Sequence, residues 1–546
     1  MDTINALRSY IESVLTNVHD MKVLLFDDET SHIASLVYTQ SELLKHDVVL
    51  IEPLSKCVNK VSDDALSILQ CVCILRPTQQ NIHDLCSELN SPHFNTYYIF
   101  FTNVVQKEML RQLALADHCC KVFVVHEIFI DVLALNKRLF SVGVPSCINS
   151  LMVRQDDPKM QRIVDGLFSM ICAFKLKTAI KYDASSSLCK AVGERLSRQI
   201  DDNNDLFQST TATSLIILID RRTDPLTPIL HNWSYQSLLH EIVGINNNIV
   251  KVSNKQSIVL DERTDDFFCS NLNANYGDLG EAHNNLLKSV QAQHTDVKDI
   301  QDVEALKKFI HTYPIYQEKK AVAAKHSELL SAISSSIKNE NLLEFAPLEQ
   351  EIAVENSQAK HFEGVMASIR DSRITDQNAL RIAILYALRY EGVKDNNIDD
   401  IKGALYSRHK GDRMVDELDR AILFAGNSYK RAEPLFLNKS LFSKARNFIG
   451  LDESGQNKFM QYTPHFASLV QKLEKKQFES PQFPSIRELP GTLEPKKFII
   501  FYVGGATYEE GRIAYQAASS GLDIIVGGTT IHNMKSFVSN EIMGNE

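Results

Sequence analysis

The residues of this 546-residue chain with the clearest chemical potential are two His-Glu pairs, a cluster of acids and bases, and two Gly-Gly pairs. The His-Glu pairs open the segments HEIFI at His126 and HEIVG at His240. A zinc protease needs a second histidine four residues after the first, so that both imidazoles face one ion. Those positions hold Ile130 and Gly244. Neither pair therefore predicts a metal site.

The acids and bases are Asp220, Arg221, Arg222 and Asp224, directly after the apolar run SLIILI at 214–219. A strand ending in an acid could hold Mg²⁺ beside a nucleotide, but that role requires a P-loop, GxxxxGK[ST], and the sequence contains none. Paired catalytic carboxylates would need a polar pocket and a raised pKa. Asp–Arg pairs that join a strand end to a neighbouring domain are common and geometrically specific, so we predict a structural role.

The two Gly-Gly pairs, at 504–505 and 527–528, each follow an apolar run. The residues after the first pair are ATYEEGR, which lack the lysine of a phosphate-binding loop. Thr507 and Glu510 have the spacing of a helix capping box. The pairs are thus predicted to be tight, closely packed turns. The sequence also contains no GxSxG serine elbow, so we predict no catalytic residues and no enzymatic activity.

Ten cysteines, nine of them before residue 190, show CVC and CC spacings but no CxxC pair. This spacing favours reduced thiols in a cytosolic protein over a zinc site. We therefore expect no metal and no cofactor.

Composition narrows the remaining classes of function. Lys+Arg 58 against Asp+Glu 68 leaves a net charge of −10, which argues against a general nucleic-acid binder. No apolar stretch approaches the ~18–20 residues of a membrane span, and the N-terminal residues do not resemble a secretory signal. Any membrane association is expected to be peripheral and to occur through a partner.

The first 135 residues alternate short apolar runs with helical stretches. Apolar runs about 25 residues apart fit βα units, and strands that are apolar on both faces are typical of a parallel sheet covered by helices. The predicted strands are 22–26, 47–51, 71–75, 97–101 and 121–125. We predict a doubly wound α/β domain over residues 1–135.

A second α/β domain is predicted to be discontinuous. One strand is expected at 214–219 and two more at 497–503 and 522–526, and so few strands on either side cannot form separate stable sheets. Residues 136–243 and 483–546 are therefore predicted to fold together. The mainly helical residues 244–482 form an insertion, and the fold class is α/β plus all-α.

Three segments resemble hallmark sequences of the syntaxin-binding SM family (Sec/Munc-type), whose members control SNARE-mediated membrane fusion. They are LIDRRTDPLTPILHNWSYQSLLHEIVGINNN (218–248), VGGATYEEGR (503–512) and VGGTTIHNMKSF (526–537). Residues 21–52 are most similar to family members that act between the Golgi and endosomes. The resemblance implies an arch of three domains, which match the three predicted above. It also implies that the protein has no catalytic activity.

The resemblance also implies that a syntaxin, a Qa-type SNARE, binds between the first and the helical domain. Its N-terminal peptide would occupy a pocket on the outer face of the first domain. The implied pocket residues are Val105, Leu110, Val122 and Val125 on the floor and Glu127 at the rim. By the same comparison, Glu52 would line the inner cleft. The alternative is that the apolar residues are ordinary core between sheet and helix.

In the helical domain, Pro314 is predicted to break the helical pattern between two amphipathic helices. In the family the corresponding tip receives an R-SNARE helix. The residues implied here are Pro314, Val322, Leu329, Ile333 and Ile337. Because every amphipathic helix has such a stripe, the alternative is that these side chains face the core of their own domain.

The expected function is therefore that of a non-enzymatic SNARE chaperone that promotes vesicle docking and fusion between the Golgi or trans-Golgi network and the endosome or vacuole. Expected partners are a Qa-SNARE of those membranes, an R-SNARE and the assembled SNARE complex. The protein is expected to be a cytoplasmic monomer that reaches Golgi and endosomal membranes through its SNAREs. The alternatives are a nucleotide-binding α/β enzyme that uses the Gly-Gly turns and a helical adaptor with a non-SNARE partner.

Overall fold

The chain forms two compact units in the computed structural model, which describes residues 1–57, 66–153, 158–253, 256–298, 303–409, 411–436 and 458–544. Unit 1 comprises Met1–Asp220, Glu479–Ala506 and Ala517–Thr530. Unit 2 comprises Arg221–Phe478, Thr507–Gln516 and Ile531–Glu546.

Unit 1 begins with a five-stranded parallel sheet in the order β2-β1-β3-β4-β5. Its strands are β1 (Lys22–Phe26), β2 (Val48–Pro53), β3 (Gln70–Leu75), β4 (Thr96–Phe101) and β5 (Val122–Glu127). All five predicted strands are present, with ends that differ by at most two residues. Side chains on both faces of β3 are buried, as expected for a doubly wound sheet.

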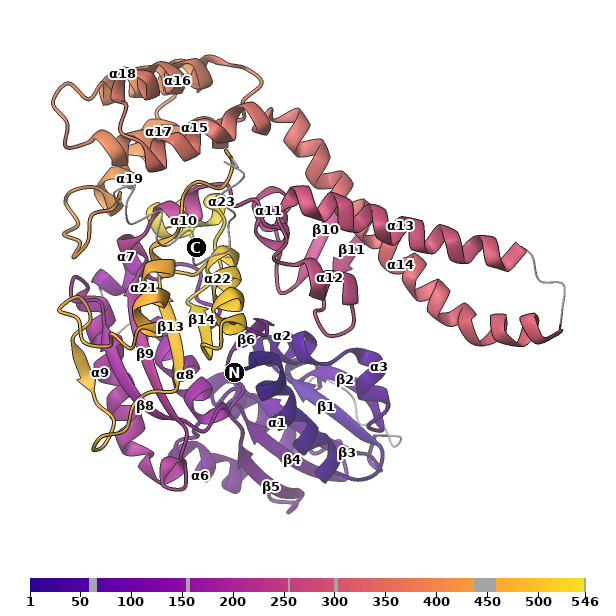
Figure 1. Ribbon diagram of the computed structural model, residues 1–546. Coiled ribbons are helices and arrows are strands. Elements are labelled where there is room, and N and C mark those ends of the chain that lie inside the picture. Colours follow the sequence, from indigo (N-terminus) through magenta and orange to yellow (C-terminus); the bar gives the residue numbers. More distant parts are fainter. Residues whose placement is uncertain are drawn as a thin grey trace. The chain divides into compact units, whose positions relative to one another are not determined.

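Helices alternate with these strands (Figure 1). They are α1 (Thr3–Asn17), α2 (Asp28–Val37), α3 (Gln40–Leu44), α4 (Leu54–Cys57), α5 (Gln79–Asn90) and α6 (Lys107–Ala116). Helices α5 and α6 pack against each other. Both contribute to a core that includes Leu85, Met109 and Leu113 together with Ile99 and Phe101 of β4.

The second sheet of unit 1 has seven strands in the order β12-β8-β9-β13-β14-β7-β6. Its strands are β6 (Leu133–Asn136), β7 (Leu139–Ser141), β8 (Lys177–Tyr182), β9 (Thr213–Asp220), β12 (Ser485–Arg487), β13 (Lys497–Val503) and β14 (Ile524–Gly528). Its helices are α7 (Ile148–Val153), α8 (Pro158–Ala173), α9 (Ser187–Asp202) and η1 (Asn204–Phe207). Because β13 pairs with β9 and β14, segments on both sides of the helical stretch share this sheet. The exact domain boundaries remain a prediction.

Apart from β12, β13 and β14 of the second sheet, the described elements after β9 are mostly helical. They are η2 (Arg221–Thr223), α10 (Leu226–Ile229), α11 (Tyr235–Ile242), β10 (Ile249–Ser253), β11 (Gln256–Val259), α12 (Asp266–Asn271), α13 (Tyr276–Lys298), α14 (Val303–Asn339), α15 (Leu342–Val354), α16 (Gln358–Arg370), α17 (Asp376–Tyr390), α18 (Ile398–His409), α19 (Arg413–Ala425), α21 (His465–Glu474), α22 (Tyr508–Ser519), α23 (Met534–Ser536) and η3 (Phe537–Ile542). The β10–β11 hairpin was not predicted from the sequence.

The predicted break at Pro314 is wrong. Helix α14 continues through Pro314 and lies alongside α13 (Figure 1). A proline inside a helix removes one backbone hydrogen bond and crowds the preceding turn. Pro314 is exposed, so solvent can bind the carbonyl group that lacks its usual donor, and the helix tolerates the residue.

The first Gly-Gly pair forms a closely packed turn after β13, as predicted, whereas Gly527 and Gly528 are not a turn but the last residues of strand β14, paired with β7 and β13. Gly504 and Gly505 have φ angles of +95° and +89°, which strain any residue with a side chain. A Cβ atom on Gly527 would lie 2.1 Å from Cζ of Phe140. The ring of Phe140 on the neighbouring strand β7 thus occupies the space that a side chain at position 527 would need.

Candidate functional site

An apolar surface lies along the edge strand β5 and the adjoining helix α6. We define the β5 edge surface as four apolar residues and one acid at their rim: Val105, Leu110, Val122, Val125 and Glu127. Strand β5 pairs only with β4 in the described sheet. Val105 lies in the connection from β4 to α6, and Leu110 lies on α6.

A register shift brings the three β5 residues to one face of the sheet. Val122 and Val125 are three residues apart, so strict alternation would place them on opposite faces. The pairing of β4 with β5 shifts between Tyr97 and Tyr98. Val122 is therefore level with Tyr97, and Val125 with Ile99. Neighbouring residues of parallel strands share a face, so both valines lie on the face that packs against α6.

The apolar residues of the β5 edge surface differ in how far they are buried. Val105 is only 9% exposed and belongs to the core of the first sheet, and Val122 packs against that core. Leu110 and Val125 are 37% and 38% exposed. Val105 thus belongs to the core and Val122 lies at its margin, whereas Leu110 and Val125 offer apolar carbon to a ligand.

Glu127 is tied to this surface by a hydrogen bond. The backbone N–H of Val105 donates to Oε1 of Glu127 at 2.8 Å. The bond orients the carboxylate towards the start of α6 and satisfies an amide that the helix itself cannot use. The structure therefore brings Val105 and Glu127 together, although they are distant in the sequence.

Sequence reasoning missed Phe123. This side chain is 71% exposed, and its ring packs against Tyr98 with centroids 5.3 Å apart. Tyr98 points away from the face that carries Tyr97, so Phe123 lies on the opposite face from the β5 edge surface. Its apolar neighbours in the sequence, VFVV, suggested only a buried strand.

Glu52, assigned by resemblance to an inner cleft, lies on β2 at the opposite edge of the same sheet. It is level with Leu25 of β1 and is partly buried. Its neighbours Val49 and Ile51 are 48% and 39% exposed.

The residues assigned to the R-SNARE tip differ in accessibility. Leu329, Ile333 and Ile337 are buried within the core of unit 2, and Val322 is partly buried. Pro314 is exposed, as are its neighbours Tyr313 and Ile315 at 43% and 54%.

A buried polar contact fixes α14 in place. The ring of His326 lies between the hydroxyl of Tyr235, 2.8 Å from Nδ1, and the carboxylate of Asp265, 3.0 Å from Nε2. Lys325 also binds Asp265 at 2.5 Å. These charge partners lower the pKa of Asp265 well below its ordinary value despite its burial. The middle of α14 is thus held firmly, unlike its exposed part near Pro314.

The two His-Glu pairs have no shared metal geometry. His126 is exposed and stacks on Phe100. His240 is buried, and its Nδ1 accepts the backbone N–H of Ile245 at 3.0 Å. Glu241 forms an ion pair with Arg381. His240 and Glu241 thus contribute to packing in unit 2, whereas His126 lies on the surface of the first sheet.

The acids and bases after β9 also have structural partners. Arg221 is fully buried, and its Nη1 donates to Oε1 of Glu510 at 2.8 Å. Burial raises the pKa of Glu510, and Arg221 opposes that shift. The backbone N–H of Thr507 donates to Oε2 of the same glutamate at 2.8 Å, which completes the predicted capping box. Glu510 of the second hallmark segment thus binds Arg221 of the first.

None of the helices in the described part of the chain combines the length and the apolar character needed to cross a bilayer.

Comparison with known proteins extends over the whole chain. The Sec1 family model matches residues 22–540. Vacuolar protein sorting-associated protein 45 of Dictyostelium discoideum is 32% identical over 556 residues, which cover 99% of this chain and 96% of that protein. The Homo sapiens protein of the same name is 30% identical over 555 residues, covering 98% and 95%.

Solved structures agree with this result. The SM protein Vps45 in complex with the Qa SNARE Tlg2 matches with a TM-score of 0.88 and 28% identity, covering 100% of this chain and 98% of that one. The Unc18–syntaxin 1 complex from Monosiga brevicollis matches with a TM-score of 0.81 at 18% identity over 100% of both chains, and this likeness concerns the fold alone.

Proposed function

Because this chain belongs to the Sec1 family, we propose that it is an SM-type regulator of SNARE assembly that binds a Qa-SNARE in transport between the Golgi and endosomes. The observation that carries the proposal is the match along nearly the whole chain to Vps45 proteins, one of which is solved with the Qa SNARE Tlg2. The β5 edge surface is the proposed binding site for the N-terminal peptide of the Qa-SNARE.

The chemistry of that surface suits an apolar peptide anchor. Leu110 and Val125 together expose branched aliphatic carbon beside an edge strand. Burying one Leu or Phe side chain contributes about 1.5–3 kcal/mol, so the peptide alone binds modestly. A second contact, to the helical region of the same SNARE, would raise the overall affinity through effective concentration.

The helical unit is the proposed site of R-SNARE alignment. Since Leu329, Ile333 and Ile337 are buried in their own core, we assign the direct contact to the exposed side chains around Pro314, including Tyr313 and Ile315. Val322 lies at the transition between the exposed and buried parts. The buried three then position the helix without touching the partner.

The remaining features of the proposal follow from the same assignment. The protein acts by binding and not by catalysis, works as a monomer, and requires no nucleic acid. It associates peripherally with Golgi, trans-Golgi network and endosomal membranes through its SNARE partners, including the assembled complex. Glu52 is proposed to contact the helical region of the Qa-SNARE.

Replacing Leu110 with arginine tests the peptide site. The variant should bind a synthetic N-terminal peptide of a Golgi or endosomal Qa-SNARE at least about tenfold more weakly, because an apolar anchor is lost and a charge is placed against it. Titration calorimetry measures the affinity. Leu115→Arg is the matched control, since Leu115 lies on the same helix and is 68% exposed. Unchanged affinity in Leu110→Arg, or an equal loss in the control, would remove the assignment.

A further inference from the structure

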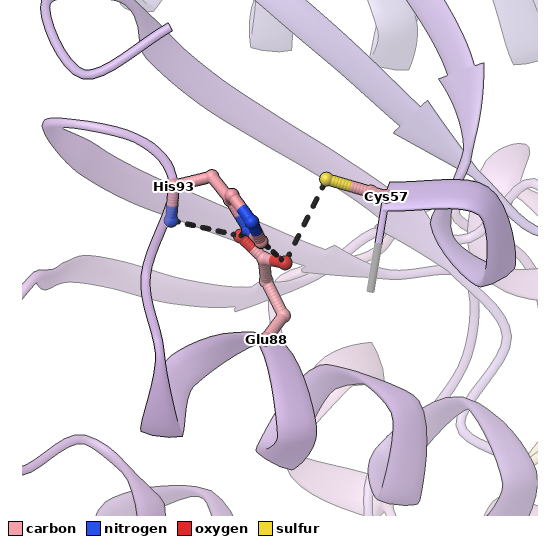
Figure 2. Close-up of side chains that lie close together, drawn as sticks. All are labelled: Cys57, Glu88 and His93. Atoms are coloured by element: carbon pink, nitrogen blue, oxygen red, sulfur yellow. Dashed lines mark hydrogen bonds and ion pairs between the residues drawn. The ribbon is translucent and has the colours of Figure 1, made fainter. Parts of the chain in front are cut away.

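Three side chains with metal-binding atoms converge inside the first sheet domain of unit 1. They are Cys57 at the end of α4, Glu88 near the end of α5, and His93 in the connection to β4 (Figure 2). Among the described residues, this is the one group of three or more such side chains whose ligand atoms all lie within 4.8 Å of one another. The cluster lies outside the β5 edge surface and has no part in the function proposed above.

The two oxygens of Glu88 have different surroundings. Oε1 accepts the hydroxyl of Tyr97 at 2.5 Å and the backbone N–H of His93 at 3.2 Å. Oε2 lies 3.6 Å from Sγ of Cys57 and 3.0 Å from Nδ1 of His93. Nδ1 of His93 also lies 3.2 Å from Oε1. The hydroxyl of Tyr97 and the backbone N–H of His93 thus hold Oε1, the thiol lies beside Oε2, and the imidazole faces both oxygens. Ligating carboxylates are commonly oriented in this way by hydrogen bonds from surrounding groups.

The separations match the edges of a tetrahedral site. Zinc binds cysteine sulfur at ~2.3 Å and histidine nitrogen or carboxylate oxygen at ~2.0–2.2 Å, so a tetrahedral angle places sulfur about 3.5 Å and nitrogen about 3.4 Å from the oxygen. The observed values of 3.6 Å and 3.0 Å lie within a few tenths of an ångström of these two edges. The third edge, from Sγ of Cys57 to a ring nitrogen of His93, is at most 4.8 Å, against about 3.6 Å in a tetrahedral site.

Burial and charge also favour a divalent cation. Cys57 and Glu88 are each 1% exposed, and the side chain of His93 is 9% exposed. A thiolate and a carboxylate carry two negative charges, which one divalent ion would neutralise. A buried charge is stable only when it is paired or coordinates a metal. The mixture of sulfur, nitrogen and oxygen ligands suits zinc better than the oxygen-preferring Mg²⁺ or Ca²⁺.

We propose that Cys57, Glu88 and His93 form a zinc site, with Sγ, Oε2 and Nδ1 as ligands and a water molecule in the fourth position. Binding releases the thiol proton of Cys57 to solvent, while His93 carries its single ring proton on Nε2 and binds through Nδ1. Tyr97 is a positioning residue that holds Glu88. The ion would tie α4 to α5 and to the start of β4.

The competing interpretation is a hydrogen-bonded cluster around Glu88 that binds no ion. Both interpretations place the same atoms together, so metal content must decide between them. Full-length protein is purified with zinc in the growth medium, dialysed, and analysed by mass spectrometry for metals. We expect one equivalent of zinc, removable by a strong chelator and restored by added zinc. Protein that neither retains nor takes up zinc at micromolar concentrations would overturn the proposal.

Matched cysteine variants test the location. Cys57→Ser should weaken zinc binding at least tenfold in competition with a chromophoric chelator. Cys86→Ser is the control because Cys86 lies on α5 only two residues from Glu88 but outside the cluster. The exposed pair Cys119 and Cys120 could bind zinc adventitiously, so their double serine variant must retain the ion. Zinc lost with Cys119 and Cys120, and kept in Cys57→Ser, would overturn the site.

A spectroscopic measurement covers the case in which Cys57→Ser does not fold. Cobalt is added to the zinc-free double variant Cys119→Ser, Cys120→Ser. One thiolate ligand should produce a sulfur-to-cobalt charge-transfer band together with the intense visible absorption of a four-coordinate ion. The band should titrate with one equivalent and disappear when zinc is added. A weak spectrum of octahedral type, with no charge-transfer band, would contradict the proposal.

Discussion

The hydrogen bond from the Val105 amide to Glu127 shows how one residue can shape the proposed peptide site. It holds one oxygen of the carboxylate near the start of α6. A ligand that approaches Leu110 and Val125 therefore meets a fixed negative group beside apolar carbon. A peptide with an aliphatic or aromatic anchor next to a basic residue would suit this arrangement.

At the residue scale, acid sensitivity is predicted at His240. Burial, together with the nearby His532, lowers the pKa of His240 to about 4. The unfolded chain, with an ordinary histidine pKa near 6.5, binds the proton more readily. Stability from this residue is therefore complete above about pH 6.5 and is lost as the pH falls towards 4, by up to about 3 kcal/mol. The thermal unfolding midpoint should fall between pH 7 and pH 5, and His240→Gln should reduce that fall.

The control for this prediction is His126→Gln, which alters an exposed histidine that also precedes a glutamate. An equal change of slope in both variants, or an unchanged slope in His240→Gln, would contradict the role of His240.

Two groups of residues could not be predicted from the sequence pattern alone. The common face of Val122 and Val125 depends on a register shift, which no alternation pattern reports, and only the family resemblance grouped them. The Cys57, Glu88 and His93 cluster was not predicted either. Its members are 31 and five residues apart, a spacing that carries no metal signature, and the packing of α4 against α5 is what brings them together.

At the scale of elements, strands were more predictable than the long helix. Strands β1 and β13 match their predicted bounds, because runs that are apolar on both faces have few other stable environments. Helix α14 was predicted as two helices because proline is a strong local signal. Local signals do not include the packing of α13 alongside α14. The periodicity of Leu329, Ile333 and Ile337 could not tell a binding face from a core face, since both repeat at the same interval.

Replacing Pro314 with alanine should stabilise the exposed part of α14. Proline costs about 3 kcal/mol relative to alanine inside a helix, and the substitution restores a backbone donor. Amide hydrogen exchange of residues 315–322 should slow by roughly tenfold to a hundredfold. Ala321→Gly, at an exposed position of the same helix, should accelerate exchange. Exchange that is unchanged or faster in Pro314→Ala would show that the proline does not weaken this helix.

At the scale of the whole molecule, the proposal requires one partner to bind at two places. The complete cytosolic region of the Qa-SNARE should bind ~10²–10⁴-fold more tightly than its N-terminal peptide or its helical region alone, provided that the linker spans both sites. Calorimetry with the three ligands measures the difference. Leu110→Arg should reduce the affinity of the complete region to that of the helical region. A complete region that binds no better than its stronger part would contradict two-site binding.

The strand order of the second sheet has a consequence for how the protein is made. Strands β13 and β14 lie at its centre, yet the ribosome reaches β13 about 275 residues after finishing β9, roughly 15–55 s later at ~5–20 residues per second. During that interval β9 has an unpaired edge, although all its side chains are buried in the finished protein. Nascent chains should therefore depend on chaperones for an unusually long period. A premature stop codon just before Lys497 would remove the middle of the sheet and not merely its margin, leaving a product destined for degradation.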